Sequence, residues 1–250
     1  MGHGVLVIDL PHAAVRRLPP VVHVGTLAFR TKGGKGQDMA GRVITIAQQK
    51  GGAGKTTLAI HLAVTWARAG KSAALVDIDP QGSLSYWYAQ REATLGADAT
   101  GITHLQISGW RTQREVERLA KTHDVVVIDS PPHAETDARI AVRTAALVVV
   151  PVQPSPMDLW ATRPTLDLAR VEKRPVMLVM NRVPARGRLL DAVAAKAAEL
   201  GVPVAAESLG NRIGFAGSLM DGLTLAETDP KSKGVEELEA LAAEIWTALD

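Results

Sequence analysis

The sequence predicts one α/β domain in which helices cover both faces of a mostly parallel, twisted sheet. Two observations lead to this prediction. Apolar segments of strand length alternate with segments of helical spacing through residues 42–250, and several of the apolar segments end in polar or charged residues. Ligands bind at the carboxyl ends of the strands in such sheets. The chain has 250 residues, 46% hydrophobic and 22% charged, so it is long enough for one substantial core.

Residues 1–38 precede this alternation and show no sustained periodicity. They contain three prolines and the glycine-rich segment 32–36, which we interpret as a poorly ordered or dispensable extension, leaving 39–250 as the domain. The extension holds five Lys or Arg residues and two Asp residues, which more than accounts for the net charge of +2. The net charge is therefore no argument that the folded domain binds nucleic acid.

The composition excludes some classes of protein. The chain has no cysteine, which excludes an iron–sulfur cluster held by cysteines and fits a reducing compartment. It contains no run of about 18 apolar residues, and its start lacks the basic-then-apolar layout of a secretory signal. We therefore expect a cytoplasmic protein.

A glycine-rich loop connects the first predicted strand, residues 43–47, to a predicted helix at 58–69. Its glycines let several backbone N–H groups turn toward one point, and the helix adds its positive N-terminal end, so the loop can bind phosphate. Lys55 follows the last glycine and is placed to reach the β- and γ-phosphates. The hydroxyl of Thr56 is placed to ligate Mg²⁺.

The loop departs from the usual phosphate-binding pattern because Gln49 replaces the first glycine and a second lysine, Lys50, follows it. The segment K-G-G-x-G-K-[ST]-T resembles the deviant Walker A loop of the ParA/MinD family of ATPases. The resemblance implies a three-layer P-loop NTPase fold, ATP and Mg²⁺ as cofactors, and a first lysine that crosses a dimer interface to the partner's phosphates. It implies catalytic roles for Lys50 and Lys55, and a nucleotide-binding role for Lys50, Gly51, Gly52, Ala53, Gly54, Lys55, Thr56 and Thr57.

The second predicted strand, residues 72–79, ends in Asp77 and Asp79. At the carboxyl edge of a parallel sheet both carboxylates would face the phosphates; the alternative is a capping role at the next helix or a solvated turn. The segment L-V-D-x-D-P-Q-G resembles the second signature of the ParA branch, which implies that Asp79 orients the attacking water. A predicted helix at 84–92 follows, with clustered aromatic residues that we expect to pack in the core, a role in a switch or an interface being the alternative: Tyr86, Trp87 and Tyr88.

The next predicted elements are a strand at 102–107, a helix at 112–121 and a strand at 124–129. The last of these ends in Asp129, which is a Walker B pattern. We therefore expect Asp129 to hold a water on Mg²⁺ beside Thr56. The following Ser-Pro-Pro resembles the start of a second switch loop, in which we expect His133 to be a surface residue.

A further strand at 146–152 leads into a proline-rich turn at 153–158. The turn is either a plain connection or, as the resemblance implies, part of the surroundings of the adenine and the dimer interface. Asn181 ends a predicted strand at 175–180, and the resemblance implies that its amide reads the adenine edge. The remaining predicted elements are helices at 158–172, 186–200, 212–220 and 234–250 and a short strand at 201–206.

The last predicted helix carries only acidic charges: Glu236, Glu237, Glu239, Glu244 and Asp250. MinD proteins end in a basic amphipathic helix that attaches to anionic lipid, and an acidic helix would be repelled from that surface. We therefore expect this helix to pack on its own domain and the protein not to bind membranes.

The resemblance covers nearly all of residues 42–250 and implies a small ParA-type partition ATPase. Such a protein forms a homodimer with ATP, binds non-specific DNA at the nucleoid, and hydrolyses ATP when a ParB-like partner stimulates it. The cargo would be a plasmid, a chromosome or another large assembly. Our candidates for DNA contact are Arg186, Arg188 and Arg212. The alternatives are a MinD-like membrane-associated positioning ATPase, a small-molecule enzyme on the same fold, and a scaffold that binds ATP without turnover.

Overall fold

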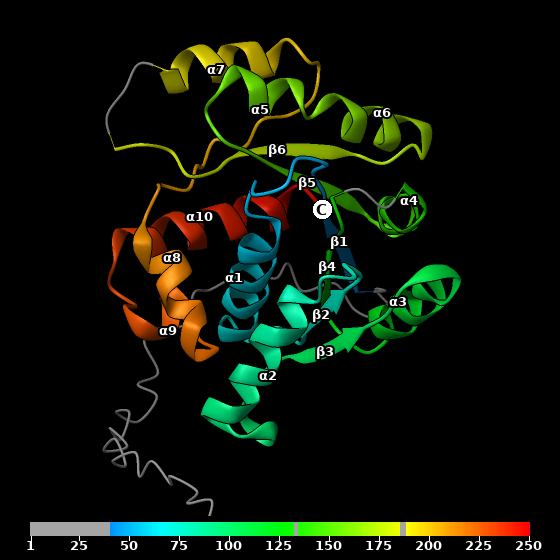
Figure 1. Ribbon diagram of the computed structural model, residues 1–250, viewed down its shortest axis with the longest axis vertical. Helices are drawn as coiled ribbons and strands as arrows, with labels where there is room; N and C mark the ends of the chain where they lie inside the picture. Colours follow the sequence, from blue (N-terminus) through cyan, green and yellow to red (C-terminus); the bar gives the residue numbers. More distant parts are fainter. Residues whose placement is uncertain (1–40, 133–134, 186–188) are drawn as a thin grey trace, which may run out of the picture.

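A six-stranded parallel sheet forms the centre of the computed structural model, which describes residues 41–132, 135–185 and 189–250 (Figure 1). The strand order is β3-β2-β4-β1-β5-β6, and every paired strand in this sheet is parallel. The strands are β1 Arg42–Ile46, β2 Ala73–Asp77, β3 Thr103–Gln106, β4 Val125–Asp129, β5 Leu147–Val152 and β6 Val176–Met180. The predicted fold class is therefore confirmed.

Helices cover both faces of the sheet, which gives three layers (Figure 1). On one face lie α1 Lys55–Arg68, α2 Ser83–Leu95, α8 Ile213–Gly217, α9 Leu225–Thr228 and α10 Lys233–Thr247. On the other lie α3 Thr112–Ala120, α4 Glu135–Thr144, α5 Pro156–Trp160, α6 Arg163–Val171 and α7 Leu189–Ala198. Three 3₁₀ turns complete the described chain: η1 Ala97–Ala99, η2 Gly109–Arg111 and η3 Ser218–Asp221.

The strands are apolar on both sides because each side is buried under helices. Along β1, Ile44 and Ile46 pack beneath α1 and α10, whereas Val43 packs beneath α3 and α4. Successive side chains of a strand point to opposite faces, so a strand covered on both faces has no polar alternation. This explains why the central strands are continuous apolar runs in the sequence.

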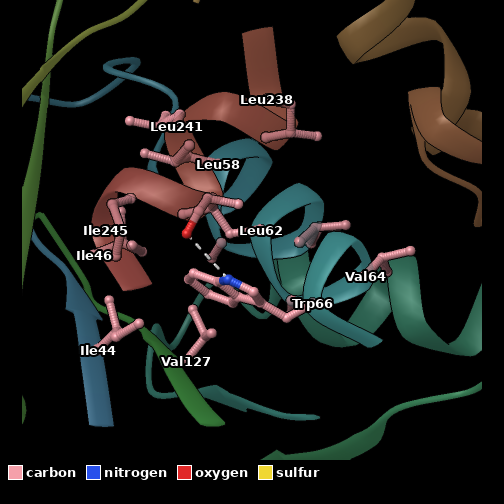
Figure 2. Close-up of a cluster of buried hydrophobic side chains, with 14 of the residues drawn as sticks. Ile44, Ile46, Leu58, Leu62, Val64, Trp66, Val127, Leu238, Leu241 and Ile245 are labelled. Atoms are coloured by element: carbon pink, nitrogen blue, oxygen red, sulfur yellow. Dashed lines mark hydrogen bonds between the residues drawn. The ribbon is translucent and has the colours of Figure 1, made fainter. Parts of the chain in front are cut away.

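The C-terminal helix α10 packs against α1, as expected from its lack of basic residues (Figure 2). Leu238, Leu241 and Ile245 are buried, and the indole nitrogen of Trp66 on α1 donates to the carbonyl of Ala242 at 3.3 Å. Within the described residues, no helix is long and apolar enough to cross a membrane.

The structure differs from the predicted elements in several places. The helix expected at 158–172 is two helices, α5 and α6, because Pro164 lies in the first turn of α6, where a proline is tolerated but cannot continue a preceding helix. The strand expected at 201–206 is reduced to a single bridge between Leu178 and Val204. Helix α4 was not predicted, although its buried residues Ala138, Ala141 and Val142 have helical spacing. The expectation that Tyr86 packs in the core is wrong, because its side chain is 78% exposed, whereas its neighbour Trp87 is buried.

His61 links the first turn of α1 to α9. Its Nδ1 donates to the carbonyl of Thr57 at 2.8 Å, and its Nε2 accepts from the backbone N–H of Leu225 at 3.2 Å. The second bond requires an unprotonated Nε2, so the ring is neutral. Burial lowers the pKa of His61 to about 4, against the hydrogen bond to Thr57 and the charge of Glu227, which raise it.

We predict that this histidine makes the protein less stable in mild acid. The unfolded chain takes up a proton near pH 6.5, whereas the folded chain resists until about pH 4, so stability is lost as pH falls through that window. The shift corresponds to about 3 kcal/mol. Urea unfolding of wild type and His61→Gln at pH 7.5 and 4.5 measures it. The difference in unfolding free energy between the two proteins should shrink at pH 4.5, and equal pH dependence of the two would contradict the prediction.

Candidate functional site

The glycine-rich loop occupies residues 47–54, between the end of β1 and the start of α1. Gly52 and Gly54 have φ angles of 77° and 90°, a region that side chains disfavour. At Gly54 a Cβ atom would also lie 2.6 Å from the amide nitrogen of Asn181. Glycine is therefore required at Gly54 both by backbone conformation and by the close approach of the residue that follows β6.

The loop borders a cavity of about 780 Å³. A smaller cavity of about 250 Å³ adjoins it, and both are bordered by Gly54, Thr57, Arg182 and Ala216. The larger one is lined by the loop and Asp79, and the smaller one by Asn181, Asn211, Ile213 and Phe215. The arrangement suits a nucleotide, with phosphates in the larger cavity beside the loop and an apolar-walled space for the base.

Lys55 begins α1 and is buried, with its side chain at the cavity. Burial lowers the pKa of Lys55, and the carboxylates of Asp129 and Asp79 oppose that shift. A buried ammonium with a nearby anion-binding loop is placed to neutralise phosphate charge. The structure thus brings together the loop, Lys55 and Asp79, as predicted from the sequence.

Thr56 and Asp129 lie side by side, since the hydroxyl of Thr56 donates to Asp129 Oδ2 at 2.6 Å. Asp129 is almost fully buried, and its other oxygen, Oδ1, has no hydrogen-bond partner among the described residues. Burial raises the pKa of Asp129 to about 7, because water is removed from around the carboxylate. A buried carboxylate oxygen without a donor is a position that a cation would stabilise.

These residues fit Mg²⁺ rather than a metal held by protein alone. Within the described part of the chain, no group of three or more His, Cys, Asp or Glu residues could hold a metal ion. Mg²⁺ uses one or two protein oxygens and completes its shell with phosphates and waters. Thr56 would supply a protein oxygen to the ion and Asp129 would hold one of its waters, and the ion would add the positive charge that β- and γ-phosphates need.

Asp77, which ends β2, and Asp79, which follows it, have different environments, and this corrects the prediction that both face the phosphates. Asp77 is fully buried and accepts from the backbone and hydroxyl of Ser85 at 2.9 and 2.6 Å, in the first turns of α2. It therefore fixes α2 and has the capping role considered as the alternative. Asp79 is partly exposed and borders the large cavity, so it alone can reach a water there.

Lys50 is bound within its own chain. Its ammonium lies 2.8 Å from Asp158 Oδ2, and Asp158 in turn accepts from the hydroxyl of Ser155, which also caps α5. Asp158 is buried, whereas the Lys50 side chain keeps 39% of its surface exposed. The proline-rich turn therefore positions the loop lysine, which makes the turn more than a plain connection.

Asn181 contacts the loop directly. Its Nδ2 donates to the carbonyl of Ala53 at 2.9 Å, and its Oδ1 accepts from the backbone N–H of Arg182. It also borders the smaller cavity. Sequence reasoning missed two neighbours, Gln153 and Arg182, which follow β5 and β6; the general rule that ligands bind at strand ends could have identified them.

The structure describes only one of the residues chosen for DNA contact. Arg186 and Arg188 lie outside the described residues. Arg212 forms an ion pair with Glu237 of α10, and its Nε donates to that carboxylate at 3.0 Å. Arg212 borders the smaller cavity, and its charge is already paired there.

We predict that Asp129→Asn separates stability from metal binding. The folded carboxyl holds its proton up to about pH 7, whereas an unfolded one releases it near pH 4, so ionisation makes the metal-free protein less stable as pH rises. At pH 8 with chelator, the variant should be more stable than wild type by up to about 4 kcal/mol. Calorimetry should show that Mg²⁺ no longer tightens ADP binding.

Asp124→Asn provides the control, because Asp124 bonds the backbone and hydroxyl of Ser72 away from the cavity. It should lose stability and keep the effect of Mg²⁺. An Asp129→Asn protein that gains no stability at pH 8, or that binds ADP with an undiminished Mg²⁺ effect, would refute the assigned site.

Comparison with known proteins agrees with the site. Residues 44–225 match the CobQ/CobB/MinD/ParA nucleotide binding domain. The chain is 30% identical over 237 residues to the chromosome-partitioning ATPase Soj of Thermus thermophilus, covering 82% of this chain and 95% of that protein. It is 25% identical over 211 residues to maintenance of carboxysome distribution protein A of Halothiobacillus neapolitanus, covering 81% and 95%.

Solved structures show the same fold. The cell division ATPase MinD of Pyrococcus furiosus superposes with a TM-score of 0.69 at 20% identity, covering 83% of this chain and 99% of that one. The Cyanothece McdA(D38A)–ATP complex gives 0.68 at 14% identity, covering 84% and 96%. The family match extends over most of the chain, and the loop, Lys55 and Asp129 have the arrangement that nucleotide binding requires. The chain belongs to the CobQ/CobB/MinD/ParA nucleotide-binding family, as an ATPase of the ParA/MinD type.

Proposed function

We propose that this ATPase is a partition or positioning protein. It dimerises on ATP, binds non-specific DNA in that form, and releases the DNA after a partner protein stimulates hydrolysis. The observation that carries the proposal is Lys50, a second lysine in the phosphate loop that lies outside the lining of its own chain's cavity. A lysine that does not serve its own nucleotide is available for a second subunit's.

The rim of the large cavity supports a second copy of the chain as the dimer partner. Tyr86, Ile213 and Met220 have exposures of 78%, 90% and 80% and border the two cavities, while Met157 and Trp160 are exposed on α5 beside the Lys50–Asp158 pair. Apolar side chains gathered around a nucleotide site favour burial against another protein. In the proposed dimer, Lys50 of each subunit leaves Asp158 for the other subunit's phosphates.

Hydrolysis in this proposal depends on Asp79, which orients the attacking water. The carboxylate borders the cavity on a short loop between β2 and α2, and Asp77 anchors that helix through Ser85. Loss of the γ-phosphate would remove the contacts that hold this loop and so loosen the dimer.

DNA binding is proposed for the dimer, because two weak patches on one rigid body bind together far better than either alone. Arg186 and Arg188 remain the first candidates. Arg212 is a weaker candidate, since Glu237 already neutralises its charge. Lys231 and Lys233 are exposed near the start of α10 and add positive charge there.

The cargo is proposed to be a plasmid, a chromosome or another large assembly reached through a ParB-like adaptor. Two relatives at 25% and 30% identity are named for carboxysome distribution and chromosome partitioning, which supports positioning of large bodies. The packed, acidic α10 disfavours the MinD-like alternative of membrane attachment. A small-molecule enzyme on the same fold stays the second alternative.

We predict that Asp79→Ala with ATP and Mg²⁺ accumulates a dimer that retains DNA. The change removes water positioning but leaves the phosphate loop and the metal-binding residues in place, so turnover should fall at least about tenfold while ATP stays bound. Light scattering should show twice the monomer mass in ATP and monomer in ADP. Filter binding should show DNA retention in ATP only, whatever the base sequence.

Salt dependence tests the kind of DNA contact. Affinity should fall with a log–log slope of about −0.9 for each phosphate contacted. Arg186→Ala with Arg188→Ala should reduce that slope and spare ATPase activity. An unchanged turnover rate in Asp79→Ala, or DNA retention that requires one base sequence, would reject the proposal.

A further inference from the structure

Three side chains at the ends of β5 and β6 hold two consecutive carbonyl groups of the phosphate loop. Gln153 Nε2 and Arg182 Nη1 both donate to the carbonyl of Gly52, at 3.1 and 3.0 Å. Asn181 Nδ2 donates to the next carbonyl, that of Ala53, at 2.9 Å. The loop is therefore attached through side chains to strand ends more than 100 residues away in the sequence.

These bonds determine where the loop's N–H groups point. In a planar trans peptide the C=O and the following N–H point in opposite directions. Holding the carbonyl of Gly52 toward Gln153 and Arg182 turns the N–H of Ala53 the other way, and holding the carbonyl of Ala53 toward Asn181 does the same for Gly54. Two successive N–H groups directed to one side of a loop are the donors of an anion-binding concavity.

The backbone conformation of Arg182 costs free energy, which contacts around the residue must offset. Its φ angle is 54°, in the left-handed region, and only one other non-glycine residue among those described, Lys173, shares this conformation. Such a conformation persists where surrounding contacts over-determine it, and it concentrates at functional sites. At Arg182 the contacts are the bond to Gly52 and the bond from its N–H to Asn181 Oδ1.

Arg182 also borders both the large and the small cavity. It therefore lies where the phosphate end of a nucleotide meets the base end. Gln153, from the proline-rich segment that also positions Lys50 through Asp158, reaches the same carbonyl from β5.

We propose that Gln153 and Arg182 are positioning residues for the nucleotide phosphates. They share one acceptor, the carbonyl of Gly52, and keep the loop peptides oriented for phosphate before any nucleotide arrives. The proposal rests on the family's nucleotide binding and not on dimerisation or DNA binding. If the positioning role of Gln153 and Arg182 is refuted, the proposed partition function still stands, and if the partition function is refuted, the positioning role still stands.

A double-mutant cycle tests the shared acceptor. Gln153→Met and Arg182→Met each remove a donor and leave an unbranched apolar side chain. Binding of Mg²⁺–ADP and of tripolyphosphate is measured by calorimetry, with folding checked by circular dichroism. Either donor alone can still hold the carbonyl, so each single change should weaken both ligands about threefold. The double change should weaken them by about thirtyfold or more, beyond the product of the singles. Tripolyphosphate has no base, so its loss of affinity places the defect at the phosphates.

Two further variants separate positioning from general stability. Arg182→Lys keeps a donor of similar reach and should restore affinity to within about twofold. Arg182→Gly relieves the strain of the left-handed backbone and removes the donor, so it should keep or raise the unfolding midpoint while weakening the binding of both ligands. Lys173→Gly relieves the same kind of backbone strain away from the loop and should leave affinity unchanged. Wild-type affinity in the folded double variant, or additive effects of the two single changes, would overturn the proposal, as would a loss confined to ADP.

Discussion

The structure depends on one constraint, the orientation of the peptide groups in the loop between β1 and α1. The loop turns its N–H donors toward the phosphate site, and the left-handed φ angles of Gly52 and Gly54 make this possible. The central position of β1, between β4 and β5, brings the ends of its neighbours to the loop. Asp129 therefore reaches the loop from the end of β4, and Gln153 reaches it from the end of β5.

Several charges around this loop are buried at a cost to stability. Lys55 and Asp129 are buried. Burial lowers the pKa of Lys55 and raises the pKa of Asp129, so in each case it favours the neutral form. Both shifts are what a site built for phosphate and a cation should show in the absence of ligand, because the ligand supplies the missing opposite charge. By contrast, Asp77 and Asp158 are buried with protein donors already in place, at Ser85 and at Lys50.

Local sequence patterns predicted most of the fold and the centre of the site. The strands that carry the loop, Asp79 and Asp129 are buried on both faces, so their apolar runs stand out, and the glycine spacing of the loop is typical of a phosphate-binding turn. Contacts between distant segments could not be predicted. The difference between Asp77 and Asp79 depends on where Ser85 lies, and the bonds of Lys50 to Asp158 and of Arg212 to Glu237 join segments whose proximity only the fold reveals.

The fold alone does not separate the possible functions. A cobyrinic acid a,c-diamide synthase from Mycobacterium smegmatis superposes with a TM-score of 0.64 at 22% identity, and MinD proteins superpose comparably. What they share with this chain is the arrangement of sheet and helices, and function depends on the residues added to that arrangement.

The central claim is that the loop holds the phosphates and that Thr56 and Asp129 hold the metal ion. A crystal structure with Mn²⁺ and a non-hydrolysable ATP analogue tests it most directly, because Mn²⁺ is located by its anomalous scattering. We expect the β-phosphate within the loop at Gly52–Lys55, and an anomalous peak about 2.1 Å from Thr56 Oγ1 with Asp129 beside its coordination shell. A nucleotide bound away from the loop, or an ion held by Asp77, would contradict it.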